Sequence, residues 1–285
     1  MQDRLFIMAQ YVVPQHALSK AAGLLAQSKN PLIKNYFIKT FANAYDVNMK
    51  EAMVPELEQY DNFNAFFTRA LKPGARPIDE TSSSFVSPAD GAISQLGKIN
   101  EQRIFQAKGH DYRVRDLLGG DRNLAETFIN GSFATIYLSP KDYHRVHMPV
   151  DGTLKQMIYV PGDLFSVNTT TSENVPNLFA RNERLVCIFD TDHGPMAMVL
   201  VGAMIVAGIE TVWAGDAAPT KRTPTITQYS ADKLENIHLK KGEEMGRFKL
   251  GSTVVLLFGE GKVFWDDALK EGTAVKMGES IGVGL

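Results

Sequence analysis

The first 45 residues place apolar side chains at a helical period. Leu5, Met8 and Val12 recur at i, i+3 and i+7, which puts them on one face of a helix. Pro14 ends this pattern, because proline lacks the backbone N–H that a helix interior needs. Further helices are predicted over residues 16–27, 31–45 and 62–70.

From about residue 84 the pattern changes to short apolar runs separated by turn residues, which is typical of β-strands. The runs predicted as strands are 90–99, 131–140, 152–162, 183–191, 194–213 and 252–258. Short helices are expected at 114–118 and 122–129, and the stretch 214–246 reads mainly as loops. The pattern predicts an α+β fold, with N-terminal helices packed on a largely antiparallel β core that forms a sandwich or a partly open barrel.

The helical start is also the basic part of the chain. Residues 1–50 hold six lysines and arginines against two aspartates, a net charge of +4, whereas the remainder carries −6. Two interpretations of this region are open on the pattern alone. The helices pack on a core of their own, or part of their apolar face lies in a membrane interface, where cationic amphipathic helices bind.

The composition is that of a globular protein, with 44% hydrophobic and 22% charged residues. No stretch approaches the roughly 20 apolar residues that span a bilayer, and residues 1–20 form no convincing signal peptide. The single cysteine, Cys187, can form neither an intramolecular disulfide nor a zinc site by itself. We therefore expect a reducing compartment and a protein that stays on the cytoplasmic side.

Three short stretches carry candidate chemistry. Asp90 lies at the entry to a predicted strand, and His144 and His147 lie three positions apart. Ser252 follows Gly251 inside an apolar run that otherwise predicts one continuous strand. An acid, an imidazole and a hydroxyl are the groups that activate a serine. Each also has a structural explanation, because Asp-Gly pairs form turns and a glycine within a strand marks a bulge or a close backbone approach.

Two other functions fit the same residues. A serine hydrolase would use Asp90, His147 and Ser252 on an external ester and would stay one chain, although Ser252 does not lie in a G-x-S-x-G elbow. A lipid-binding β domain without enzymatic activity would leave Ser252 inert.

The stretch 250–253, "LGST", resembles the self-cleavage signature of the phosphatidylserine decarboxylase family. The resemblance extends, in the expected order, to "PADG" (88–91), "YHRVHMP" (143–149), "VPGDLFSVN" (160–168), "NLFARNER" (177–184), "IETVWAG" (209–215) and "KGEEMGRFKLGST" (241–253). These blocks cover most of the chain and are most similar to the bacterial membrane-associated type. On this resemblance, the membrane interpretation of the N-terminal helices is favoured.

The resemblance implies that the chain makes its own prosthetic group. Ser252 Oγ would attack the Gly251 carbonyl and convert the peptide bond to an ester, and β-elimination would release a β chain of residues 1–251. The dehydroalanine left at the head of the α chain, residues 252–285, would become a pyruvoyl group with loss of ammonia. Glycine suits the cleaved position because, without a Cβ, it leaves its carbonyl accessible. No metal and no diffusible cofactor are implied.

The resemblance also implies a role for each candidate residue. His147 would be the base for Ser252, and Asp90 would hold the histidine's tautomer and stabilise its imidazolium. The pyruvoyl ketone would form a Schiff base with the amine of phosphatidylserine and accept electrons as CO₂ leaves, which yields phosphatidylethanolamine. His144 would donate the proton to the former α-carbon or contact the headgroup.

The implied organisation has two parts, a helical membrane-associating region of residues 1–70 and a catalytic β-rich domain of residues 71–285. The partners would be an anionic phospholipid surface, phosphatidylserine itself and the two chains of the cleaved protein, which would stay paired. The resemblance places the protein peripherally on the cytoplasmic face of the cell membrane. A homodimer is suggested by analogy with bacterial relatives, and no nucleic acid is implied.

Overall fold

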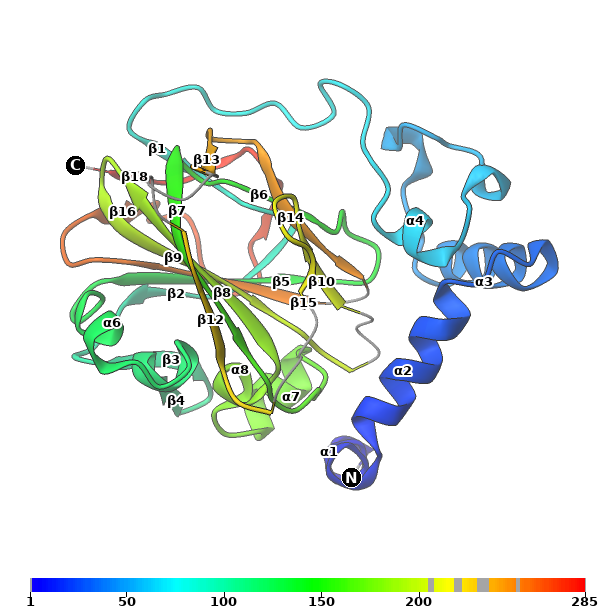
Figure 1. The fold of residues 1–285 in the computed structure, drawn as a ribbon, viewed down its shortest axis with the longest axis horizontal. Helices are drawn as coiled ribbons and strands as arrows, with labels where there is room; N and C mark the ends of the chain where they lie inside the picture. Colours follow the sequence, from blue (N-terminus) through cyan, green and yellow to red (C-terminus); the bar gives the residue numbers. More distant parts are fainter. Residues whose placement is uncertain (1, 205–207, 218–221, 230–235, 250–251, 285) are drawn as a thin grey trace.

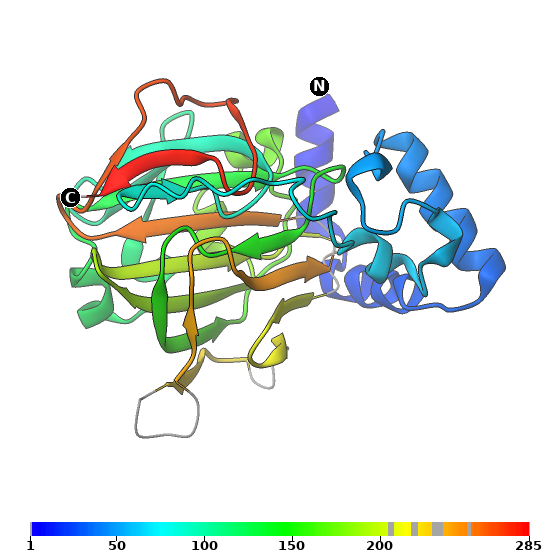
Figure 2. The ribbon, with the colours of Figure 1, turned by 90° about the horizontal axis from the view of Figure 1, so that it is seen from above.

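The computed structural model describes residues 2–204, 208–217, 222–229, 236–249 and 252–284. Helices from the N-terminal region lie at one end of the molecule, and a body of stacked β-sheets forms the rest (Figures 1 and 2). The predicted α+β class is confirmed. The sheets are open and stack in layers, so the sandwich alternative describes them better than a barrel does.

The N-terminal helices follow the predicted pattern closely. They are α1 (Gln2–Val12), α2 (Gln15–Ala26) and α3 (Pro31–Ala44), followed by the 3₁₀ turns η1 (Met49–Glu51) and η2 (Leu57–Gln59) and by α4 (Phe63–Phe67). The Asn30 side chain caps α3 by accepting hydrogen bonds from the backbone N–H groups of Leu32 and Ile33. The helix predicted over 62–70 is shorter, because Thr68 leaves helical geometry and caps the end of α4.

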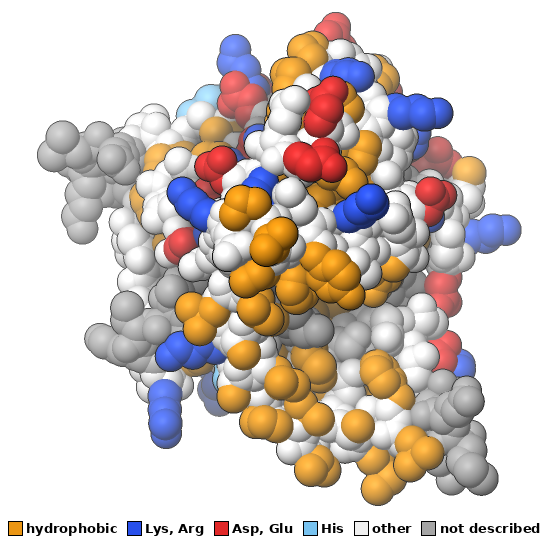
Figure 3. Space-filling view, turned by 90° about the vertical axis from the view of Figure 1, so that its right-hand side faces the viewer, with side chains coloured by type: hydrophobic (Ala, Val, Ile, Leu, Met, Phe, Trp, Pro, Cys, Tyr) orange, Lys and Arg blue, Asp and Glu red, His pale blue; other side chains and the backbone are white. Residues whose placement is uncertain are grey.

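The helical region has a small core of its own and also exposes many apolar side chains. One side of α3 packs on α4 in a small aromatic core that contains Ile38, Phe63, Phe66 and Phe67. Many large apolar side chains of α1, α2 and α3 are exposed to solvent, among them Leu5, Met8, Val12, Leu24, Leu32 and Tyr36. Figure 3 shows hydrophobic side chains gathered on this end of the molecule. Within the described residues, no helix combines the length and apolar character needed to cross a bilayer.

The largest sheet has nine strands among the described residues, in the order β12-β7-β8-β9-β15-β5-β2-β17, with β13 also paired to β7. Its strands are β2 (Gly91–Lys98), β5 (Ser132–Leu138), β7 (Gly152–Val160), β8 (Arg184–Thr191), β9 (Gly194–Val201), β12 (Thr225–Gln228), β13 (His238–Leu239), β15 (Ser252–Phe258) and β17 (Ala274–Val275). Every pairing is antiparallel. The C-terminal strand β15 therefore lies in the middle of this sheet, between β5 and β9.

A second sheet has the strand order β11-β10-β14-β6. Its members are β6 (Arg145–His147), β10 (Gly208–Thr211), β11 (Gly215–Ala217) and β14 (Glu244–Lys249). The predicted strand 252–258 is confirmed as β15, and the apolar run that precedes it belongs to β14, a strand of a different sheet. The run 194–213 likewise forms two strands, β9 and β10, in different sheets. An apolar run does not reveal such a crossing, because strands of both sheets are buried.

The remaining strands are β1 (Ser84–Val86), β16 (Val263–Trp265) and β18 (Ser280–Gly284), which form a small sheet, and the hairpin β3 (Arg103–Ala107) with β4 (His110–Arg113). Short helices cover the other face of the large sheet: α5 (Val114–Leu117), α6 (Arg122–Glu126), α7 (Thr169–Asn174) and α8 (Leu178–Arg181). The first two confirm the predicted helices. The helices α7 and α8 were not predicted, because segments of six and four residues carry too little periodicity.

Alternating residues of β15 serve two hydrophobic cores. Val254 and Leu256 belong to the core between the large sheet and the smaller ones. Val255 and Leu257 belong to the core under the short helices. Because side chains of a strand point alternately to opposite faces, β15 is buried on both sides, and this explains its unbroken apolar sequence.

Candidate active site

The junction of interest lies where the chain passes from one sheet to the other. Strand β14 ends at Lys249, and β15 begins at Ser252, whose backbone pairs with Leu138 of β5. Gly251 and the side chain of Ser252 lie outside the described residues. Only two residues connect two strands that are each paired on both sides. The backbone on either side of this junction is therefore held in a fixed register.

Both candidate histidines lie beside the strand that leads to the junction. Strand β6 pairs with β14, with Arg145 opposite Arg247. The carbonyl of His144 accepts a hydrogen bond of 3.0 Å from the Phe248 N–H, and His147 lies opposite Glu244. The tertiary pairing thus brings the "HRVH" stretch next to residues about 100 positions later in the sequence.

Asp90 reaches the same end of the large sheet through strand β2. Ala92 of β2 pairs with Tyr137 of β5, and Tyr137 pairs with Thr253 of β15. Because neighbouring strands lie about 4.8 Å apart, the start of β2 is roughly two strand spacings, about 10 Å, from the start of β15. Gly91 is required here, because a Cβ at this position would lie 2.3 Å from the Tyr137 carbonyl oxygen. The Asp-Gly pair therefore serves a close strand approach rather than a turn.

His147 is held as a neutral ring with its proton on Nδ1. Its Nδ1 lies 2.8 Å from the Gly242 carbonyl oxygen, which can only accept, so Nδ1 donates. Its Nε2 lies 3.0 Å from the Tyr143 hydroxyl and accepts from it. Burial lowers the pKa of His147, with the Gly242 hydrogen bond and the charges of Glu244 and Asp90 acting in the opposite direction. Burial also raises the pKa of Tyr143 to about 12, so this hydroxyl keeps its proton.

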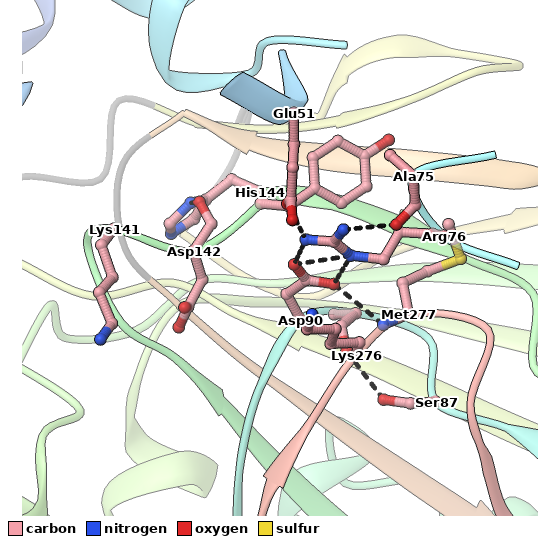
Figure 4. Close-up of polar contacts among 12 residues, drawn as sticks. Glu51, Ala75, Arg76, Ser87, Asp90, Lys141, Asp142, His144, Lys276 and Met277 are labelled. Carbon is pink, nitrogen blue, oxygen red and sulfur yellow. Dashed lines mark hydrogen bonds and ion pairs between the residues drawn. The ribbon is translucent and has the colours of Figure 1, made fainter. Parts of the chain in front are cut away.

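Asp90 is held by an arginine that the sequence analysis did not single out. Arg76 Nε lies 2.8 Å from Asp90 Oδ1, and its Nη2 lies 2.5 Å from Oδ2 and 2.9 Å from Glu51 Oε2 (Figure 4). The Met277 N–H donates a further hydrogen bond of 2.9 Å to Asp90 Oδ1. Hydrogen bonding to Asp90 raises the pKa of Arg76 further above its usual range. This cluster joins the helical region, the β body and the C-terminal segment.

The structure therefore separates two tasks that the resemblance had assigned to Asp90. The tautomer of His147 is held by the Gly242 carbonyl, and among the described residues no hydrogen bond joins Asp90 to the histidine ring. The charge of Asp90 still acts on His147 through space and favours its protonated form. Sequence alone offers no signal for the Gly242 contact, which joins positions 95 residues apart.

His144 is completely buried and packs on the N-terminal region. Its ring centroid lies 4.0 Å from that of Phe67 in α4, and its Nδ1 lies 2.8 Å from the Asp142 carbonyl oxygen. Burial lowers the pKa of His144 to about 3, so the ring is neutral near pH 7. Its Nε2 is buried without a hydrogen-bond partner in the part of the chain that the structure describes. In this state Nε2 presents a lone pair and can accept a proton, but the ring has no proton to give at that atom.

A hollow of about 330 Å³ opens beside these residues. Its wall includes Asp90, Gly91 and Tyr143 from the catalytic cluster, and residues 274–276 from the C-terminal segment. Cavities that hold small ligands begin near 300 Å³. The hollow is therefore large enough for a polar headgroup, and it lies at the ends of β2 and β5, the strands next to β15.

The Arg76 cluster yields a test of how Asp90 is held. Replacing Arg76 with glutamine should lower the free energy of unfolding by about 3–5 kcal/mol, because a buried carboxylate would lose its charged partner. The matched control is Arg103→Gln, which removes an exposed ion pair to Asp111 and should cost about 0–1 kcal/mol. Urea unfolding measures both. Equal losses in the two variants would contradict the account of Asp90.

The chain matches known sequences along almost its whole length. The family model described as phosphatidylserine decarboxylase matches residues 63–283, and a second model, described as PSD, matches residues 5–46. Proteins named phosphatidylserine decarboxylase proenzyme from Stutzerimonas stutzeri and Pseudomonas entomophila are each 61% identical to it, over 99% of this chain and over 95% and 99% of their own lengths. The protein of that name from Pseudomonas fluorescens is 60% identical over the full chain and 99% of its own length. The chain belongs to the phosphatidylserine decarboxylase family.

Proposed function

We propose that the chain is a self-processing decarboxylase that converts phosphatidylserine to phosphatidylethanolamine and CO₂ at a pyruvoyl group made from Ser252. Family membership supports the activity, and the names of the relatives describe a proenzyme. The observation that carries the proposal is the position of the junction. The His144 backbone pairs with Phe248 near the end of β14, Asp90 precedes β2, which lies two strands from β15, and a hollow of about 330 Å³ opens beside them.

On the family resemblance, His147 is proposed as the base, and it lies on β6 opposite Glu244 of β14. A neutral imidazole with a lone pair on Nε2 can accept the Ser252 hydroxyl proton as Oγ attacks the carbonyl carbon of residue 251. The Tyr143 hydroxyl occupies that lone pair in this structure, so it must turn aside or pass the proton on. General-base help of this kind is worth about 10²–10⁴-fold in rate.

Asp90 would act by charge rather than by direct contact. Its carboxylate, which Arg76 holds, favours the imidazolium that forms when His147 accepts a proton. This is the stabilising part of the role expected from the resemblance. The orienting part would fall to Gly242, whose carbonyl oxygen receives the Nδ1–H.

The surroundings of β15 fit a prosthetic group at residue 252. The ketone of a pyruvoyl group would supply the electron sink that decarboxylation needs. The orphaned Nε2 of His144 is a buried acceptor with no partner in the described structure, which suits a residue that meets substrate. We propose that His144 contacts the headgroup, with its Nε2 accepting a hydrogen bond from the amine of the incoming substrate.

After the cut, the α chain would stay bound without any covalent link. Strand β15 is paired on both sides, and β17 and β18 pair with strands of the β chain. The Met277 N–H would also remain on Asp90. The two chains would therefore form one folded unit that only denaturant separates.

The helical region would hold the enzyme at an anionic membrane. Its exposed apolar side chains and net charge of +4 match the requirements of interfacial binding. The same region forms a wall of the site, because Phe67 packs on His144 and Arg145 Nε donates to the Thr68 carbonyl. Docking on a membrane would thus bring the hollow close to lipid headgroups on the cytoplasmic face.

The primary test combines chain cleavage with lipid turnover. Wild-type protein should run as two chains under denaturing conditions and release CO₂ from carboxyl-labelled phosphatidylserine. Ser252→Ala should stay one chain and release none, and His147→Ala should slow cleavage by about 10²–10⁴-fold. A wild-type protein that stays intact yet hydrolyses esters would favour the serine hydrolase. An intact protein that binds lipid equally well as Ser252→Ala would favour the non-enzymatic alternative.

The pH dependence of cleavage tests the state of His147. Burial lowers its pKa below the ordinary 6.5, so the neutral, base-competent form persists as the pH falls through 6.5. The cleavage rate of newly synthesised protein should stay level from about pH 8 to 6.5 and decline only below that. A midpoint at or above 6.5 would contradict this assignment. A time course on denaturing gels measures the rate.

Membrane docking is tested by removing apolar contact area without touching the small aromatic core. The triple variant Leu24→Ser, Leu32→Ser and Tyr36→Ser changes side chains that are 66%, 84% and 69% exposed. It should lose most of its binding to vesicles of anionic phospholipid in a flotation assay, while chain cleavage continues. The control Ile226→Ser with Phe264→Ser removes exposed apolar groups from the β body and should float as wild type. Equal flotation of both variants would contradict docking through the helices.

A further inference from the structure

One buried cation of the site, Arg69, has no carboxylate partner among the described residues, although its guanidinium lies 5.7 Å from the centroid of the Phe66 ring. Arg69 follows α4 and is only 4% exposed, yet it makes no ion pair with any described residue. Its Nη2 donates to the carbonyls of Lys141, at 3.0 Å, and Asp142, at 3.4 Å. Its Nε and Nη1 are buried without hydrogen-bond partners among the described residues. Burial lowers the pKa of Arg69, which shows that its surroundings disfavour the charge.

Arg184 shows what a satisfied buried arginine looks like in the same protein. It is 2% exposed, and its Nε, Nη1 and Nη2 donate to the carbonyls of Leu117, Asn182 and Asp116. That set anchors the loop after α5 and needs no ligand. Arg69 has one donor atom engaged where Arg184 has three. A buried charged donor that is left unpaired is costly, so the site around Arg69 is incomplete without an anion.

Arg69 lines the hollow next to the catalytic cluster, together with Lys141 and Lys276. Both lysines are exposed, and neither makes an ion pair within the described part of the chain. Acidic side chains also line the wall, but most are engaged. Asp90 and Glu51 are bound by Arg76, Asp142 Oδ2 accepts from the N–H and hydroxyl of Ser139, and Asp46 is exposed to solvent. The unpaired charge in the buried wall is therefore positive.

We propose that Arg69, with Lys141 and Lys276 beside it, binds the phosphodiester of the lipid headgroup. This inference rests on the proposed function and names the substrate group that the hollow receives. A guanidinium matches phosphate oxygens in geometry and forms strong charge-assisted hydrogen bonds with them. The Asp142 carbonyl accepts from both Arg69 and His144, so a phosphate held at Arg69 lies close to the histidine that is proposed to contact the substrate.

The carboxylate of the headgroup is a poorer match for Arg69. That group loses its charge as CO₂ leaves, so a cation bound to it would stabilise the ground state more than the transition state. The phosphodiester keeps its charge throughout the reaction. Binding there positions the substrate without opposing the chemical step.

The kinetic test uses cleaved enzyme in mixed micelles of detergent and phosphatidylserine. Arg69→Gln should raise KM at least about tenfold and leave kcat within about threefold, because the lost contact is equal in the ground and transition states. The KM of Arg69→Lys should lie between the values of the wild type and Arg69→Gln, since lysine keeps the charge but not the planar guanidinium. The control Arg122→Gln changes an exposed arginine away from this hollow and should behave as wild type. An unchanged KM in Arg69→Gln would overturn the proposal.

A binding test separates this inference from the proposed function. In uncleaved Ser252→Ala protein, which needs no catalysis, calorimetry should detect glycerophosphoethanolamine, a phosphodiester without a carboxylate, and Arg69→Gln should abolish that binding. Tighter binding of free serine, which has a carboxylate and no phosphate, would overturn the phosphodiester assignment. If Arg69→Gln fails to fold, the double variant Lys141→Gln with Lys276→Gln is measured in its place. It should weaken glycerophosphoethanolamine binding about three- to tenfold, and unchanged binding in this double variant would overturn the phosphodiester proposal.

Discussion

The structure depends on the short connection between strands β14 and β15, which belong to different sheets. The chain must leave the small sheet after Lys249 and enter the centre of the large sheet at Ser252, and both strands are held on both sides by fixed registers. Neither strand can shift by one residue without turning its buried side chains to the wrong face. Strand β14 pairs with β6, which carries His147, and the His144 carbonyl accepts a hydrogen bond from Phe248 near the end of β14.

The same constraint explains why the fold can survive a cut at this junction. Strands β15, β17 and β18 each pair with strands from earlier in the chain, and β15 contributes to two hydrophobic cores. Chain continuity at 251–252 is not needed for these contacts. A broken backbone can relax locally while the surrounding sheets keep the new chain end beside the hollow.

The helical region is part of the site as well as a surface. Phe67 packs on His144, Glu51 pairs with Arg76, and Arg69 lines the hollow. A boundary at residue 70 therefore separates the helical region from the β body, but residues on both sides of it contribute to the candidate site. This arrangement links the helical end of the molecule to the candidate site through a few direct contacts.

Much of the fold could be predicted from the sequence, because helix and strand periodicity are local. The helices near residues 15–26 and 31–44 and the α+β class follow from such patterns. The division of an apolar run into β14 and β15 could not, since both strands are buried. The family resemblance pointed to Asp90 and His147, and the structure puts Asp90 directly before β2 and His147 on β6, opposite Glu244. It gave no sign of Arg76, Tyr143 or Gly242, whose contacts appear only when distant segments pair.

The chemical identity of the first residue of the smaller chain tests the central claim most directly. Tandem mass spectrometry of that chain, isolated under denaturing conditions, should find a pyruvoyl group followed by Thr253 and no free amine at its start. A free serine at residue 252 would mean simple hydrolysis of the junction. That result, or an uncut polypeptide from freshly made wild-type protein, would contradict the account.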